Sequence, residues 1–150
     1  MKKIFLFILT VIITTASFSQ VQNPVKWNYT AKKINPTTYE IYLTANVSGN
    51  WHLYSQFTPD GGPVPTAITF AKNPLVTLQG KAKEVGKLQQ KHEPLFGVDV
   101  KQFGGTVNFV QTVKLKSPVK TNIAGSVEYM VCDDTQCLPP ATQKFSIALK

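Results

Sequence analysis

The sequence contains no arginine. Specific recognition of phosphates and base edges relies on the bidentate guanidinium group, so we exclude nucleic acid as a partner despite the basic charge. Lysine supplies all of the strong positive charge, and after the first twenty residues even the closest pairs, Lys32/Lys33, Lys81/Lys83 and Lys114/Lys116, are dispersed along the chain. Such dispersion is typical of solvated strand faces and not of a nucleic-acid-binding stripe.

Long apolar runs are missing after the first twenty residues. The chain begins MKKIFLFILTVIITTASFSQ, in which two lysines precede an apolar run and then small residues, the order of a secretory signal peptide. The run is shorter than the roughly 20 residues that a membrane-spanning helix needs. We therefore predict a signal peptide at residues 1–19, a single domain at residues 20–150, and a periplasmic or secreted location in which disulfides persist.

A helical apolar stripe longer than two turns is also absent from the sequence. Strict alternation over residues 37–47 and 105–115 instead indicates half-buried strands. Residues 25–34, 125–131 and 144–150 indicate further strands, and turn signals rich in glycine, proline and asparagine separate them. Seven or more short strands at this spacing predict an all-β fold, an immunoglobulin-like antiparallel β-sandwich.

Only two cysteines are present, and both lie in the stretch MVCDDTQCLPP, residues 130–140. Their separation lets the two Cα atoms come within bridging distance. The double proline that follows cannot join a ladder of hydrogen bonds and stiffens the loop. We expect Cys132 at the end of one strand and Cys137 in the turn before the last strand, at a hairpin tip near solvent.

Three uses of this cysteine pair are open. A disulfide that closes so short a loop stabilises a fold by about 2 kcal/mol, against about 4.7 kcal/mol for a loop of about a hundred residues. That difference favours an accessible redox pair over a structural staple only modestly. A metal site would need His52 and His92 as further ligands, and these lie forty residues apart, unlike the short spacing of zinc modules. We expect no metal and no other cofactor.

The cysteine stretch resembles a known family. YMVCDDTQCLPP, followed by a short apolar strand, is similar to the active hairpin of the N-terminal domain of DsbD, the bacterial thiol:disulfide interchange protein. VSGNWHLYSQ (47–56) resembles that family's aromatic strand, and HEPLFGVDVKQFGGTVNF (92–109) its cap loop and the next strand. The resemblance covers most of residues 25–149. It implies an immunoglobulin-like domain that receives electrons through a membrane protein and reduces disulfides in exported partners.

The resemblance also implies roles for individual residues. Cys132 and Cys137 would be the redox pair, and Cys137 would form the mixed disulfide with a partner. The cap loop would hold Glu93, Leu95, Phe96 and Gly97, and the site lining would comprise Trp51, His52, Tyr54, Asp133, Asp134 and Pro139. Better-known members have one more residue between the cysteines and an aromatic pair in the cap, where this chain has leucine and phenylalanine after Pro94. Ordinary packing is the alternative for the apolar and aromatic residues of both groups.

The two aspartates after Cys132 should disfavour a thiolate there, which favours the disulfide and predicts a reducing pair. Their alternative use is turn formation. The resemblance implies a thiol:disulfide oxidoreductase, a component of protein-disulfide reduction. Its partners would be exported thioredoxin-like or other thiol proteins, together with a separate membrane electron donor, and we expect a monomer. The alternative is an immunoglobulin-like binding or adhesion module whose hairpin disulfide is purely structural.

Overall fold

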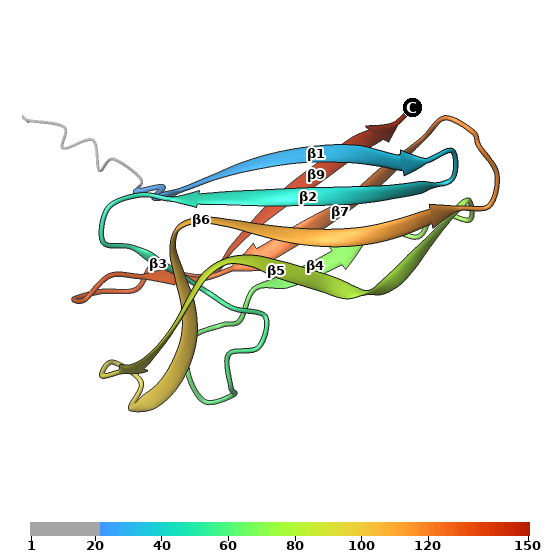
Figure 1. The fold of residues 1–150 in the computed structure, drawn as a ribbon. Helices are drawn as coiled ribbons and strands as arrows, with labels where there is room; N and C mark the ends of the chain where they lie inside the picture. The colour runs from blue at the N-terminus through green and yellow to red at the C-terminus, as the bar shows by residue number, and fades with distance from the viewer. Residues whose placement is uncertain (1–21) are drawn as a thin grey trace, which may run out of the picture.

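The computed structural model describes residues 22–150, which fold into two antiparallel sheets (Figure 1). The predicted signal peptide, residues 1–19, lies outside the described residues. The six-stranded sheet contains β1 (Val25–Asn35), β2 (Thr38–Val47), β3 (His52–Tyr54), β5 (Val76–Glu93), β6 (Val98–Leu115) and β8 (Val131–Cys132). The three-stranded sheet contains β4 (Ala67–Phe70), β7 (Thr121–Tyr129) and β9 (Ala141–Leu149). The predicted immunoglobulin-like all-β sandwich is confirmed.

The core lies between the two sheets and follows from the alternation of apolar residues along the strands. Ile41 and Leu43 on β2 and Phe109 on β6 face Ile123 on β7 and Ile147 on β9, and all five side chains are buried. Period-two burial of this kind brings one face of each sheet out of water, and that transfer is the main driving force for folding.

The strand order is β1-β2-β6-β3-β8, and β5 pairs with β6 along the outer side of the first sheet. The predicted strand at 105–115 is longer than expected, because β6 begins at Val98. β5 was not predicted at all. Fourteen of its 18 residues are exposed, so it lacks the apolar alternation that marks a half-buried strand. Its lysines, including Lys81 and Lys83, lie on solvated faces as expected and discourage pairing with another chain.

The prediction of one continuous strand that ends at Cys132 is wrong. β7 ends at Tyr129, where it pairs with Ala141 of β9 in the three-stranded sheet. After Met130 the chain crosses to the other sheet, and β8 pairs with β3. This crossing places Cys132 directly opposite His52, so the cysteine hairpin belongs to the larger sheet.

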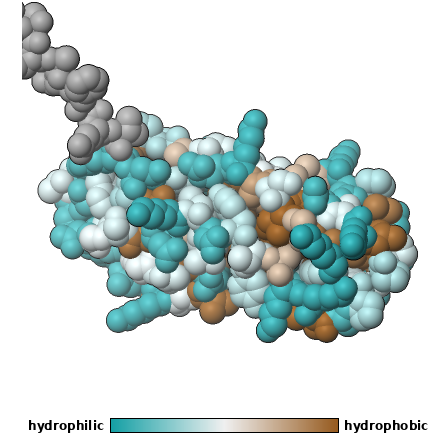
Figure 2. Space-filling view, turned by 90° about the horizontal axis from the view of Figure 1, so that it is seen from above, coloured by the Kyte–Doolittle hydropathy of each residue, from teal (hydrophilic) through white to brown (hydrophobic). Residues whose placement is uncertain are grey.

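The surface is mainly hydrophilic on the face shown in Figure 2, where hydrophobic residues form only small separate patches. Within residues 22–150, the structure contains no helix with the length and apolar character needed to cross a membrane. The cysteine hairpin and the tip of the β5–β6 hairpin lie at the same end of the molecule (Figure 1).

Candidate functional site

Cys132 and Cys137 form a disulfide across a tight hairpin, with their Cα atoms 4.0 Å apart. The Asp133 amide donates to the Gln136 carbonyl at 2.9 Å, and the Leu138 amide donates to the Val131 carbonyl at 2.9 Å. Cys137 is partly exposed, whereas Cys132 is only 1% exposed. The expectation that both sulfurs lie near solvent is therefore wrong for Cys132. This residue lies on β8, which pairs with β3, and the Cys132 side chain packs inward.

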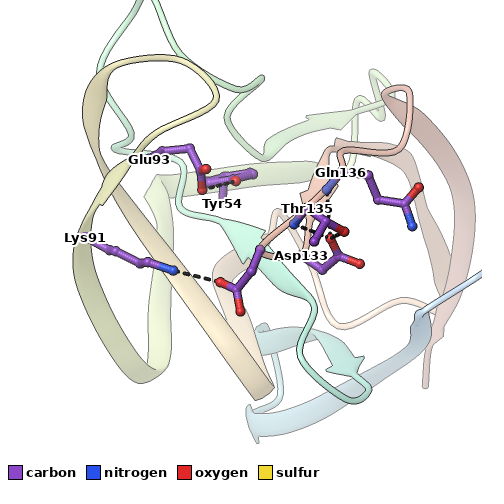
Figure 3. A network of polar contacts seen from close by, with 7 residues as sticks. Tyr54, Lys91, Glu93, Asp133, Thr135 and Gln136 are labelled. Atoms are coloured by element: carbon purple, nitrogen blue, oxygen red, sulfur yellow. Dashed lines mark hydrogen bonds and ion pairs between the residues drawn. The ribbon is translucent and has the colours of Figure 1, made fainter.

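Asp133 organises the loop between the two cysteines. Its Oδ1 accepts hydrogen bonds from the Thr135 amide, the Thr135 hydroxyl and the Gln136 amide, each at 2.8 Å (Figure 3). The backbone amides of Thr135 and Gln136 lower the pKa of the Asp133 carboxyl, because they stabilise its charged form. An aspartate that bonds to its own loop in this way supports the turn-forming use of this residue.

The hydrogen bonds of Asp133 should make the stability of the hairpin pH-dependent. Because the folded pKa lies below the ordinary value of 3.8, the charged group stabilises the fold above that pH and loses this contribution as the pH falls through the folded pKa. We expect Asp133→Ala to lower the melting temperature at neutral pH and to have little effect in strong acid. Thermal melting of both proteins across the acid range tests this, and an equal difference at every pH would contradict it.

A small apolar cluster lies beside the disulfide and is separate from the main core. Tyr54, Val100 and Cys132 are buried in it, and Phe96 and Cys137 pack against it. The alternation of β3 and β8 explains this arrangement, since Leu53 and Val131 face the main core while the next residue along each strand faces the cluster.

The cap loop between β5 and β6 turns back over this cluster. The amides of Phe96 and Gly97 donate to the Glu93 carbonyl at 3.1 and 2.8 Å, which closes the turn. Gly97 has a φ of 68°, a left-handed conformation that glycine adopts without the steric cost of a Cβ. The turn points Phe96 inward, whereas the neighbouring Leu95 is 51% exposed.

Glu93 and Tyr54 join the cap loop to the strand beneath it. The Tyr54 hydroxyl donates to Glu93 Oε2 at 3.2 Å, and the Glu93 residue is only 5% exposed (Figure 3). Burial raises the pKa of the Tyr54 hydroxyl, and the nearby Glu93 carboxylate raises it further. The tyrosine therefore stays protonated at neutral pH and remains a donor to the carboxylate.

An ion pair connects the cysteine loop to β5. Lys91 Nζ lies 2.9 Å from Asp134 Oδ1, and both side chains are substantially exposed. Figure 3 shows Lys91 reaching from the β5–β6 hairpin toward the cysteine loop. The Asp134 carboxylate raises the pKa of the Lys91 ammonium group. The role of Lys91 could not be predicted from the sequence, because Lys91 and Asp134 are 43 positions apart and no local pattern relates them.

The remaining predicted site residues do not all face the disulfide. His52 is the strand partner of Cys132 and lies on the same face. Trp51 instead packs against the main core. Pro139 is exposed and lies on the edge of a groove on the other face of the hairpin. Among the residues that the structure describes, no group of three or more histidine, cysteine, aspartate or glutamate side chains could hold a metal ion.

Residues 20–149 match the family described as the N-terminal part of the thiol:disulfide interchange protein DsbD. The N-terminal periplasmic domain of ScsB from Proteus mirabilis is similar in structure, with a TM-score of 0.57 and 17% identity. That match covers 85% of this chain and 47% of the other, so this chain spans about half the length of that structure.

The DsbD N-terminal domain of Neisseria meningitidis, in its reduced form, has a TM-score of 0.56 and 13% identity, over 83% of this chain and 85% of that one. At these identities the two structures show a shared fold. Among curated proteins, none matches the sequence significantly.

Proposed function

The chain belongs to the family of the DsbD N-terminal domain, and from this we propose that it carries reducing equivalents to exported thiol proteins through Cys132 and Cys137. The observation that supports the proposal most strongly is the asymmetry of the disulfide. One sulfur belongs to a buried residue within the sheet, and the other belongs to a partly exposed residue on the outer arm of a short hairpin.

The exchange reaction is a two-electron transfer in two steps. The Cys137 thiolate of the reduced protein attacks a sulfur of the partner's disulfide, which forms a mixed disulfide and releases one partner thiolate. Cys132 then loses its proton, and its thiolate attacks the Cys137 sulfur and releases the second partner thiolate. The partner gains two electrons, and the Cys132–Cys137 disulfide is left behind. A separate membrane donor of dithiol character would return the protein to its reduced form.

Burial supports Cys137 as the first nucleophile. Cys132 packs against Tyr54 and Val100, so a partner sulfur cannot reach it without displacing the cluster. Cys137 lies on the outer arm and is partly exposed. Thiol exchange requires the attacked and attacking sulfurs to approach in line, so access decides which cysteine reacts.

Phe96 is proposed to shield the pair. We expect Phe96→Ala to raise the rate at which iodoacetamide alkylates the reduced protein by about tenfold. This corresponds to a decrease of about 1.4 kcal/mol in the free-energy barrier to alkylation. Leu95→Ala is the matched control, because Leu95 lies in the same turn and points outward. Mass spectrometry of the alkylated peptide measures the rate for Cys137. Equal rates in the two variants would contradict the shielding role.

The charge of Asp133 supports a reducing pair, because Asp133 adjoins Cys132 and disfavours a thiolate there. Asp134 contributes less, since Lys91 offsets its charge. We expect a reduction potential nearer to that of thioredoxin, about −270 mV, than to that of the oxidant DsbA, about −120 mV. Equilibration with glutathione buffers measures the potential. A value close to that of DsbA would overturn the proposed direction of transfer.

A structural disulfide is the second candidate, and the burial of Cys132 favours it. In that case the chain would be an immunoglobulin-like binding or adhesion module. The two functions differ in a reduction assay with thioredoxin-class reductants. If the pair stays oxidised under these conditions and the Cys→Ala variants merely melt at lower temperature, the adhesion module is correct.

We further propose that residues 1–19 are removed on export, that residues 20–150 form the working domain, and that it acts in the periplasm as a monomer. The lysine-led apolar N-terminus supports export, as does the periplasmic origin of the Proteus domain. N-terminal sequencing of the exported protein tests the cleavage site, and sedimentation analysis tests the oligomeric state.

A further inference from the structure

The edges of the two sheets meet along β1 and β9. Near the middle of both strands the Tyr29 and Phe145 rings lie 5.3 Å apart, and at the far end Lys33 Nζ donates to the Lys150 carbonyl at 3.1 Å. At the other end, near Pro24 and Ala141, the two edges are separated. A groove of about 630 Å³ lies there between residues 22–24 and Ala141 at the start of β9, a volume typical of ligand sites.

This groove ends at the redox hairpin. Gln136 and Leu138, the two neighbours of Cys137, both line it. Val131 lines it as well, and since side chains alternate along β8, the groove lies on the opposite face of the hairpin from the cap loop. Cys137 is on the outermost arm of the hairpin, so a polypeptide bonded to its sulfur can continue over that arm into the groove.

The lining is rich in amides and carries no charge. Gln22, Asn23, Gln136 and Gln143 contribute four side-chain amides, each able to donate and accept as a peptide group does. None of the lining residues within 22–150 is charged, although the whole chain contains sixteen lysines and eight acidic residues. A charged ligand would lose hydration in the groove without finding an opposite charge, so the lining favours an uncharged polypeptide.

One feature of the groove favours an extended main chain as the occupant. β9 is an edge strand of the three-stranded sheet in the described structure, and β1 lies against it only from its middle onward, so the outer amides and carbonyls at the start of β9 can pair with an added strand.

We propose that this groove binds an extended, uncharged segment of the partner thiol protein, next to the partner's reactive cysteine. The inference rests on the proposed exchange function and adds a basis for choosing partners. The cap-loop side of the hairpin would control access to the sulfurs, and the groove side would hold the chain that carries the incoming cysteine.

The test uses the Cys132→Ser protein, in which Cys137 is the only thiol. Three synthetic peptides each carry a central cysteine as a mixed disulfide with thionitrobenzoate. The residues that flank this cysteine are threonine and valine in the first peptide, lysine in the second, and glutamate in the third. Mercaptoethanol activated in the same way is the small probe. Release of thionitrobenzoate gives each rate, which is divided by the rate of the same compound with free mercaptoethanol.

We expect the uncharged peptide to react about tenfold faster than either charged peptide, because only the charged ones must bury an unpaired charge. Gln143→Glu should lower the ratio of the uncharged-peptide rate to the small-probe rate by about tenfold for the same reason. Ser146→Glu adds the same charge to an exposed position of β9 outside the groove and should leave this ratio unchanged.

Other results overturn the inference in distinguishable ways. If the three peptides react at similar rates, or Gln143→Glu behaves like Ser146→Glu, the groove does not hold the partner and the exchange function is unaffected. If the glutamate peptide is fastest, the surface lysines select partners instead. If even the small probe fails to react with Cys137, the proposed function fails, and the groove inference fails with it.

Discussion

Replacing Cys137 by serine should abolish disulfide exchange, with a loss of at least about a thousandfold, because a serine hydroxyl is not ionised at neutral pH and cannot form the mixed disulfide. The rate at which the reduced protein reduces a thioredoxin-like partner measures this loss. The fold should survive the change, because Cys137 is only partly buried and the short loop contributes about 2 kcal/mol when it is closed.

Cys132→Ser is the matched control, since it removes the same number of sulfur atoms from the same hairpin. This variant should also fail to turn over, but it should accumulate the mixed disulfide that Cys137→Ser cannot form. The reason is that Cys137 still attacks the partner, and no second thiol remains to resolve the intermediate. Equal trapping by both variants would show that the cysteines are interchangeable.

Replacing Phe109 by alanine should have the largest effect on stability, a loss of about 3–5 kcal/mol. Phe109 is fully buried on β6, with the Trp27 ring 6.0 Å away, and its loss leaves a cavity at the centre of the sandwich. Urea denaturation measures the change in free energy of unfolding.

Phe57→Ala makes the same chemical change at a residue that is 49% exposed. It removes only about half as much buried surface and leaves no enclosed cavity, so we expect it to cost about 1 kcal/mol. A similar loss in both variants would mean that the core does not lie where the structure places it.

Much of the fold was predictable, because β2 and β6 carry the alternation of half-buried strands. The two failures have physical causes. Most of β5 is exposed, so its sequence contains no apolar period. The chain crosses between the sheets at Met130 because residues 131–132 pair with β3 and do not continue the pairing with β9. This choice is not visible locally, since β3 is distant from residues 131–132 in the sequence.

The candidate site was predictable where its residues are local. Cys132 and Cys137 lie in one short hairpin, and the resemblance implied their roles. The burial of Cys132 was not visible, because it follows from the pairing of β8 with β3. The Lys91–Asp134 contact joins β5 to the cysteine loop, and the Tyr54–Glu93 contact joins it to β3, so both appear only when the chain is folded.

The most direct test of the account identifies the sulfur that partners attack. The oxidised protein is mixed with a thioredoxin-class protein whose resolving cysteine has been replaced by serine, and the trapped complex is digested and sequenced by mass spectrometry. We predict a disulfide between the probe and Cys137, with Cys132 recovered as a free thiol. A link to Cys132, or an intact Cys132–Cys137 disulfide after prolonged incubation, would contradict the account.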